Sequence, residues 1–216
     1  MELKNNALFK ETCFIGGKWI ESDSGEKIKV DNPANGEIIG EVPKCSTSET
    51  QKAIKDAQTA FPSWRDKTAK ERSIILQKWA RLIEANADDL AKIMTIEQGK
   101  PLAEAKGEIL MGVTYIDFYA EEGKRVYGDI IPDPMPDRRI VIIKQPVGVV
   151  GALTPVTNPT ATPASNAVTI LTGRNAVIFA PHPSAKVSSK MAIDFMRNGL
   201  EKVGAPADLI QIIEEP

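Results

Sequence analysis

The stretch VGVVGALTPVTNPTATP, residues Val147–Pro163, decides the fold that this chain is expected to adopt. It begins as a short apolar run and changes at Pro155 into a segment rich in proline and threonine that holds a single asparagine, Asn158. Apolar runs of this length are typical of strands buried on both faces of a parallel sheet. Two similar runs follow, NAVIFA at Asn175–Ala180 and LIQII at Leu209–Ile213. The three runs predict three parallel strands.

Helical periodicity separates these runs. One amphipathic segment lies between the first two runs, and a second begins near Ser184; their apolar positions are Ala164, Ala167, Val168, Leu171, Val187, Met191 and Phe195. The order β-α-β-α-β with right-handed crossovers puts both helices outside the sheet. The predicted fold class is therefore α/β, a Rossmann-like doubly wound nucleotide-binding domain. Such a sheet needs further strands, so we expect the domain to be incomplete in this chain.

The first 128 residues predict short strands followed by helices of the same domain. Turns are expected at Gly16–Gly17, Ser24–Gly25 and Asn35–Gly36. Capping boxes formed by Ser46 with Glu49 and by Thr68 with Glu71, and a third pair of Asn86 with Asp89, predict three helix starts, with Gly99 ending the third helix. A fourth helix is expected from Pro101 through Lys124 and Arg125, stopping at Gly128. The predicted buried faces comprise Ala53, Ile54, Ala57, Ala60, Phe61, Ile74, Ile75, Trp79, Leu82, Ile83, Ala105, Ile109, Val113, Ile116 and Ala120.

Residues 129–146 predict a hairpin of two strands around a proline-rich turn. Pro132, Pro134 and Pro136 exclude it from the centre of a sheet, so it should lie at an edge or project outward. Its apolar strand residues need a cover, which another subunit or the rest of this chain would supply. The expected organisation is thus 1–128, 129–146 and 147–216.

Composition excludes several classes of function. A net charge of −2 gives no electrostatic case for binding nucleic acid or an anionic membrane. Two cysteines, Cys13 and Cys45, without a CxxC pair, predict neither a disulfide framework nor a metal site, and we interpret both as structural. Neither a signal peptide nor an apolar run of membrane-spanning length is evident, so the cytoplasm is the expected location.

Ligands of open α/β sheets bind beyond the carboxyl ends of the strands. Here those ends are Leu153–Pro155 and Phe179–Pro181. Asn158 follows the first, and its carboxamide has two interpretations: a donor to a developing oxyanion, or an Asn-Pro turn residue. His182, the only histidine, follows the second, without an evident acid, serine or cysteine partner nearby. The common phosphate-binding fingerprints GxGxxG and GxxxxGK are absent.

The runs FIGGKWIES, VDNPANGEIIGEVP, TIEQGKPLAEAKGEI and FYAEEGKRVYGDIIP resemble the N-terminal part of aldehyde dehydrogenases, most closely the succinate-semialdehyde dehydrogenases. The resemblance implies NAD(P)-dependent oxidation of a small aldehyde of semialdehyde type by a cysteine thiolate, with a glutamate activating water. It also implies a homo-oligomer built through the 129–146 hairpin. Both catalytic residues would lie beyond Pro216, so we expect this chain alone to be inactive. The alternative that involves no enzyme activity is a truncated, non-catalytic fragment.

After about Val147 the sequence is similar to a different branch, the CoA-acylating aldehyde dehydrogenases, through TPVTNP, TGRNAVIFAPHP and GAPADLIQII. An acylating reaction with CoA as cosubstrate is therefore the alternative within the enzyme class. In an ungapped comparison the family's oxyanion asparagine falls on Thr157, with Asn158 next to it, and a ribose-binding lysine falls on Ala180. The resemblance places the cofactor, NAD or NADP, at Thr154, Pro155, Ala180, His182 and Ser184, with free N–H groups near Ser184 suited to an anion.

Overall fold

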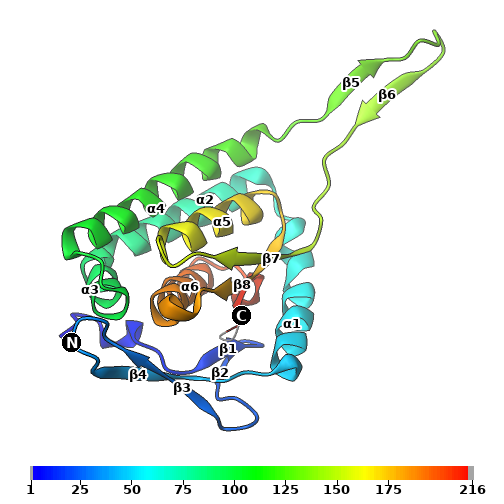
Figure 1. Cartoon of the computed structure of the whole chain (residues 1–216). Coiled ribbons are helices and arrows are strands. Elements are labelled where there is room, and N and C mark those ends of the chain that lie inside the picture. The colour runs from blue at the N-terminus through cyan, green and yellow to red at the C-terminus, as the bar shows by residue number, and fades with distance from the viewer. Residues whose placement is uncertain (1, 214–216) are drawn as a thin grey trace.

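The computed structural model describes residues 2–213 and contains a three-stranded parallel sheet (Figure 1). The strand order is β7-β8-β9, with bounds β7 Val149–Thr154, β8 Ala176–Pro181 and β9 Ile210–Ile212. Val177 of β8 pairs with Val150 on one side and with Ile210 on the other. The three apolar runs thus form the predicted strands, and the α/β, Rossmann-like fold class is confirmed.

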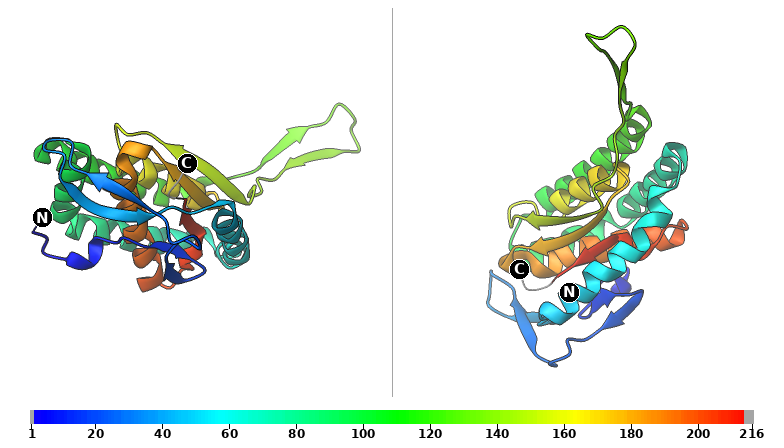
Figure 2. Two further views of the ribbon diagram at one scale, coloured as in Figure 1. Left: turned by 60° about the horizontal axis from the view of Figure 1, so that its bottom comes forward. Right: turned by 90° about the vertical axis from the view of Figure 1, so that its right-hand side faces the viewer.

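Helices cover both faces of this sheet. Helices α5 (Ala161–Thr172) and α6 (Lys186–Lys202) connect consecutive strands, as predicted, and they pack against each other. Helix α1 (Thr47–Arg65) lies on the opposite face, where it crosses in front of the strands in the right-hand view of Figure 2. The indole N–H of Trp64 donates to the carbonyl oxygen of Leu171 at 2.8 Å, so α1 also fixes the end of α5.

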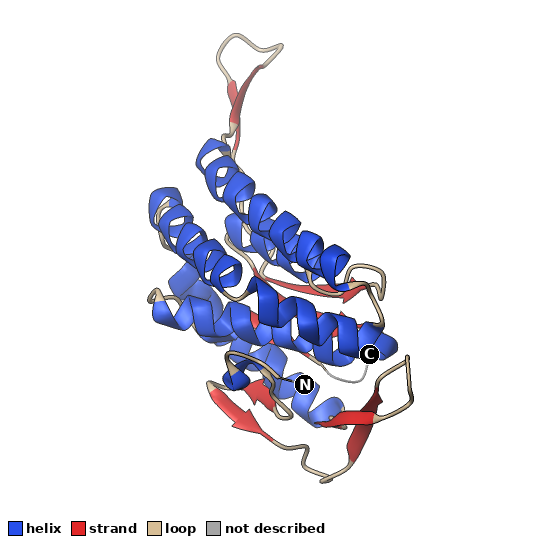
Figure 3. Ribbon diagram, turned by 90° about the vertical axis from the view of Figure 1, so that its left-hand side faces the viewer, coloured by secondary structure: helices blue, strands red, loops and turns tan. Residues whose placement is uncertain are grey.

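A second helical layer covers α5 and α6 on the side away from the sheet (Figure 3). It consists of α2 (Ala69–Ala85), α3 (Ala87–Gln98) and α4 (Leu102–Glu122). Helix α4 packs along α5, and a Cβ added at Gly112 would lie 3.3 Å from the Cβ of Ala164, so the two backbones approach closely there. Helices α2 and α3 both contact α6.

Two N-terminal hairpins and four short 3₁₀ turns complete the body. The hairpins pair β1 (Cys13–Ile15) with β2 (Lys18–Ile20) and β3 (Lys27–Asp31) with β4 (Ile38–Pro43). The predicted glycine turns are present, with positive φ at Gly16, Gly17, Gly25 and Gly36. The 3₁₀ turns are η1 (Asn6–Leu8), η2 (Gly123–Arg125), η3 (Pro183–Ala185) and η4 (Ala207–Leu209).

The hairpin of β5 (Asp129–Pro132) and β6 (Arg139–Ile142) projects away from the body (Figure 1). Every residue of both strands is exposed, including Ile130 at 74% and Val141 at 62%. The prediction of a projecting hairpin is confirmed, and the alternative that it packs on its own chain is wrong for the described residues. At its base, Gly128 lies so close to the carbonyl oxygen of Ile142 that a Cβ atom would not fit there.

The helix starts are partly as predicted. Both capping boxes form, Ser46 with Glu49 and Thr68 with Glu71, and Gly99 ends α3 with a φ of 83°. The third pair is a wrong prediction: Asn86 precedes α3 without a side-chain cap, and Asp89 instead accepts hydrogen bonds from backbone N–H groups of the N-terminal segment.

Three further expectations are corrected. Helix α4 ends at Glu122, because the chain tightens into the 3₁₀ turn η2 at Gly123 and packs against Thr172, so Lys124 and Arg125 lie outside the helix. Ile54 and Ile74 are 46% and 43% exposed, since each lies beside rather than on the buried stripe of its helix. Helix α6 begins at Lys186, after η3, rather than at Ser184.

Candidate functional site

The carboxyl ends of β7 and β8 lie side by side. Thr154 pairs with Pro181, and Leu153 with Ala180, so the loops that follow the two strands leave the sheet from the same edge. Thr154 is buried, and its hydroxyl oxygen has no hydrogen-bond partner within residues 2–213. A buried hydroxyl without a partner at a strand end is suited to a ligand group.

A pocket of about 340 Å³ opens beyond these strand ends. The loop after β7 contributes Val156, and the turn after β8 contributes Pro183 and Ser184. Its other walls come from β3, α3 and the first turn of α6; they are Ile28, Lys29, Val30, Asp31, Pro33, Glu97, Gln98 and Lys186. Sequence analysis predicted the strand ends, but it assigned the β3–β4 hairpin no part in the site.

The first turn of α6 is occupied by a carboxylate from α3. Glu97 is buried and accepts hydrogen bonds from the backbone N–H groups of Val187 and Ser188 and from the Ser188 hydroxyl. Burial raises the pKa of Glu97 to about 7, against these three hydrogen bonds, which lower it. The expectation that this helix start offers free N–H groups to an anion is therefore wrong for Val187 and Ser188.

The first turn of α5 is occupied in the same way. Glu108 of α4 is buried and accepts from the backbone N–H of Thr160 at 3.0 Å, the Thr160 hydroxyl at 3.0 Å and the N–H of Ala161 at 2.9 Å. Its second oxygen pairs with Lys100. A carboxylate at a helix N-terminus satisfies donors that have no partner inside the helix. Glu108 therefore fixes the point where the loop after β7 becomes α5.

Two residues between these carboxylates bind the loop itself. The Gln98 amide donates to the carbonyl oxygen of Val156 at 3.1 Å, and the Lys100 ammonium donates to that of Thr157 at 2.7 Å. Gly99 lies between them in a left-handed conformation that L-residues rarely adopt, which directs the two side chains from the end of α3 to the loop. The segment from Glu97 to Glu108 thus holds both strand-end loops, and sequence analysis missed this role.

The predicted site residues are not all gathered in the pocket. Ser184 lines it, while Pro155, Asn158 and His182 are exposed. The carbonyl oxygen of Asn158 accepts from Thr162 at 3.2 Å, and within residues 2–213 its carboxamide makes no hydrogen bond. His182 Nδ1 accepts from the Ser184 N–H at 3.1 Å, so this histidine caps the 3₁₀ turn η3. Ala180 supplies no polar side chain.

The pocket has a polar lining. The Lys29 and Lys186 side chains, the Ser184 hydroxyl and the half-buried Gln98 line it together with the carboxylates of Asp31 and Glu97. Lys186 brings a cation to this strand end where Ala180 has none. Lys186 is not among the residues predicted from the sequence, although PSAK places it two positions after the predicted Ser184.

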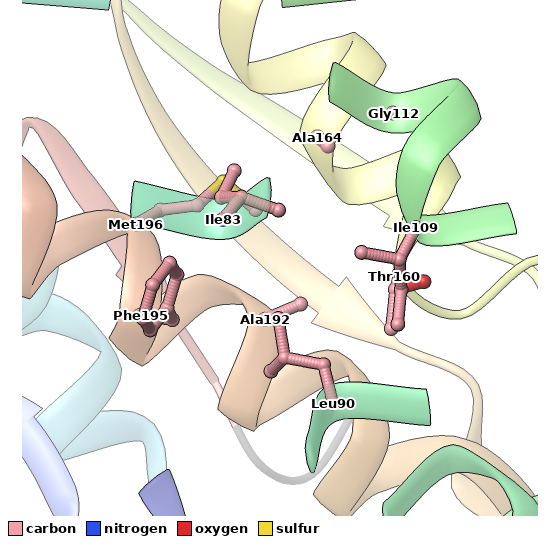
Figure 4. Close-up of a pocket in the computed structure, with 9 residues that line it drawn as sticks. All are labelled: Ile83, Leu90, Ile109, Gly112, Thr160, Ala164, Ala192, Phe195 and Met196. Carbon is pink, nitrogen blue, oxygen red and sulfur yellow. The ribbon is translucent and has the colours of Figure 1, made fainter. Parts of the chain in front are cut away.

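A second, smaller cavity lies between the helices and has a different character (Figure 4). It holds about 20 Å³, room for a single water-sized group, and is lined by Ile83, Leu90, Ile109, Gly112, Thr160, Ala164, Ala192, Phe195 and Met196. Apolar side chains from both helical layers surround it. It is a gap in the packing of the core and not a site for the predicted cofactor.

Residues 2–213 contain no group of three or more His, Cys, Asp or Glu side chains placed to hold a metal ion. In the same residues, no helix combines the length and apolar character that crossing a membrane requires.

The aldehyde dehydrogenase family model matches residues 19–216. This chain belongs to the aldehyde dehydrogenase family. A glutarate-semialdehyde dehydrogenase of Pseudomonas putida is 44% identical over 213 residues, which cover 99% of this chain and 44% of the relative. The chain therefore spans less than half the length of that relative. The family prediction is confirmed.

Solved structures agree. The crystal structure of succinate-semialdehyde dehydrogenase from Burkholderia pseudomallei has a TM-score of 0.94 at 41% identity, over 100% of this chain and 44% of that chain. Betaine aldehyde dehydrogenase from Staphylococcus aureus, solved in complex with NAD⁺, has a TM-score of 0.87 at 26% identity, over 95% of this chain and 41% of that chain.

Proposed function

We propose that this chain is the N-terminal, cofactor-binding part of an NAD(P)-dependent semialdehyde dehydrogenase. The observation that carries the proposal is the pocket beyond β7 and β8, whose two loops are fixed by Gln98, Lys100 and the Glu97 and Glu108 carboxylates. Semialdehyde dehydrogenases among the similar proteins support this substrate class. When bound, NAD or NADP would accept the hydride.

The chain's own residues have distinct roles in this proposal. Ser184 and Lys186 hold the ribose and phosphate groups of the cofactor, and Thr154 is buried at the adjoining strand end. The free carboxamide of Asn158 donates to the oxygen that becomes negatively charged when a thiolate attacks the aldehyde. Pro155 and the neighbouring Ala180 leave room for the cofactor beside the strands, and His182 fixes the turn that carries Ser184.

The nucleophile and the general base are proposed to lie outside residues 1–216. Attack of a cysteine thiolate would give a thiohemiacetal, and loss of hydride from it a thioester. Both cysteines of this chain belong to the N-terminal strand region, with Cys13 in β1 and Cys45 just before α1. We therefore expect residues 1–216 alone to have no dehydrogenase activity.

A CoA-acylating reaction is the second candidate function. Ala180 stands where hydrolytic relatives carry a ribose-binding lysine, and APHPSAK, which supplies His182 and Ser184, is similar to the acylating branch. In this reaction CoA instead of water would release the acyl group from the thioester. Assays of the full-length enzyme with and without CoA separate the two: carboxylate formed without CoA contradicts the acylating reaction.

The experiment that tests the proposed role of the loop is Asn158→Ala in the full-length enzyme. Removing one oxyanion donor should lower kcat by roughly 10²–10³-fold, with KM for the cofactor unchanged. Asn166→Ala, in the same helix-loop unit but on α5, is the matched control and should retain kcat. If Asn158→Ala lowers only the melting temperature, Asn158 is a turn residue and its catalytic role is refuted.

We also propose that the β5–β6 hairpin joins copies of this protein into a homo-oligomer. Its exposed apolar strands are the support, since Ile130, Val141 and Ile143 are 74%, 62% and 70% exposed. An exposed pair of strands also offers unpaired backbone groups at its edges.

A further inference from the structure

The two cysteines of the chain meet in space although 32 positions separate them. The Sγ atom of Cys13, in β1, lies 3.1 Å from that of Cys45, in the segment between β4 and α1. Both are thiols. Cys13 is 1% exposed, whereas Cys45 is partly exposed, so Cys45 is the more accessible of the two residues.

The surroundings allow a bond between them. Cys13 belongs to a small apolar cluster with Ile15 and Ala53, separate from the main core, and Cys45 packs against its edge. A disulfide needs its sulfurs at about 2.05 Å, roughly 1 Å closer than they are. Cys45 lies outside any helix or strand, next to the N-cap residue Ser46, so a small backbone adjustment there closes this gap.

We propose that Cys13 and Cys45 form a reversible disulfide, a modification site in the N-terminal strand region. The oxidant is a peroxide. The Cys45 thiolate attacks hydrogen peroxide, taking one oxygen to become a sulfenic acid and releasing hydroxide. The Cys13 thiol then attacks the Cys45 sulfur, the S–S bond forms, and the sulfenic oxygen leaves as water with the thiol proton. A dithiol reductant restores both thiols.

The bond would fasten β1 to the segment before α1, within an apolar cluster that is separate from the main core. Strand β1 lies beside the first turns of α1 (Figure 1), and the hairpin touches the C-terminal part of the chain through ring contacts of Phe14 and Trp19 with the cations of α6. Closing a loop of this length constrains the unfolded chain, which should raise the melting temperature by roughly 5–10 °C.

The test treats the purified protein with hydrogen peroxide, blocks remaining thiols with N-ethylmaleimide and maps peptides under non-reducing conditions. We expect a peptide containing Cys13 linked to one containing Cys45 within a single chain, lost on adding dithiothreitol. The Cys13→Ser variant is the matched control: its Cys45 sulfenic acid has no resolving thiol and should react with dimedone, while the wild type should not.

Three results would overturn the proposal. The first is that N-ethylmaleimide still modifies both cysteines after peroxide treatment. The second is that dimedone modifies Cys45 of the wild type and no linked peptide forms. The third is that disulfides form only between chains. The wild-type map alone decides the matter if the Cys13→Ser variant does not fold. An oxidised protein that melts at the same temperature as the reduced one would refute the fastening role.

Discussion

Replacement of Glu108 by alanine is expected to destabilise the protein much more than its position on a surface helix suggests. The carboxylate caps α5 through the N–H groups of Thr160 and Ala161 and pairs with Lys100, which in turn binds the loop carbonyl of Thr157. Alanine removes the acceptor and leaves a cation that is 15% exposed without its carboxylate. The loop that carries Asn158 then loses its fixed end.

The expected size of the effect follows from these two losses. An N-terminal cap contributes about 1 kcal/mol, and breaking one side of a buried ion pair costs about 3–5 kcal/mol. Lys100 keeps its hydrogen bond to the carbonyl oxygen of Thr157, so we take the lower end of the range for the broken ion pair. The sum is about 4 kcal/mol, a lowering of the melting temperature by roughly 8–16 °C. The Glu108→Gln variant keeps an oxygen that can accept hydrogen bonds from the first turn of α5. Its free energy of unfolding should fall by about 2 kcal/mol.

Urea unfolding followed by circular dichroism measures these differences. Glu104→Ala and Glu104→Gln are matched controls, because Glu104 is exposed in the first turn of the same helix. They should change the free energy of unfolding by less than about 1 kcal/mol. If Glu108→Ala is no less stable than Glu104→Ala, the anchoring of the loop by Glu108 is refuted.

Three further predictions concern other parts of the chain. Because the pKa of Glu97 is raised from 4.5 to about 7, its ionisation opposes folding, so the unfolding free energy should fall by about 3 kcal/mol as pH rises from 4.5 to 7. Urea titrations of Glu97→Gln should show no such fall of the unfolding free energy with pH. A wild-type unfolding free energy that rises from pH 4.5 to 7 would show that the three hydrogen bonds lower the pKa of Glu97 more than burial raises it. The Ser46 hydroxyl and the Asp23 N–H lower the pKa of Glu49 to about 2, so its stabilisation is present above pH 4.5 and lost as pH falls toward 2. Glu49→Gln should flatten the acid limb of a melting-temperature profile, and an unchanged limb would contradict this. Ile130→Lys with Val141→Lys should reduce the oligomer seen by light scattering in the full-length protein without lowering the stability of the fold; an unchanged mass would refute the proposed contact.

Local patterns predicted most of the fold. The apolar runs became β7, β8 and β9. Strands β8 and β9 are buried almost throughout, as apolar runs predict, whereas β7 is an edge strand whose Leu153 is 83% exposed. The capping boxes formed because both partners lie within one helical turn. The Asn86–Asp89 pair has the same spacing and failed, since Asp89 binds the N–H groups of Lys4 and Asn5 at 3.1 and 2.8 Å. A partner 84 residues away cannot be detected from helical spacing.

The site shows the same division between local and distant contacts. Strand-end rules located Thr154, Ser184 and the loop of Asn158, because the polypeptide leaves a parallel sheet at a defined edge. The residues that fix those loops lie elsewhere: Glu97 binds Ser188 across 91 positions, and Glu108 binds Thr160 across 52. Each glutamate lies in a helix of usual amphipathic pattern. The residues next to it in the sequence do not predict its distant hydrogen-bond partner.

These distant contacts also give the segment TIEQGKPLAEAKGEI a structural role, although it lies outside the β-α-β-α-β unit. The helix starts of α5 and α6 follow the loops at this edge of the sheet, and each would otherwise offer unpaired N–H groups to an anion. Glu97 and Glu108 occupy both with carboxylates of the protein itself. In the proposed function, an anionic cofactor group would then meet side chains such as Lys186 and Ser184, which line the pocket. Asn158 stands on a loop that Gln98 and Lys100 hold through its backbone carbonyl groups. A fixed loop of this kind is what an oxyanion donor requires, because stabilisation in the transition state depends on donors that are already in place.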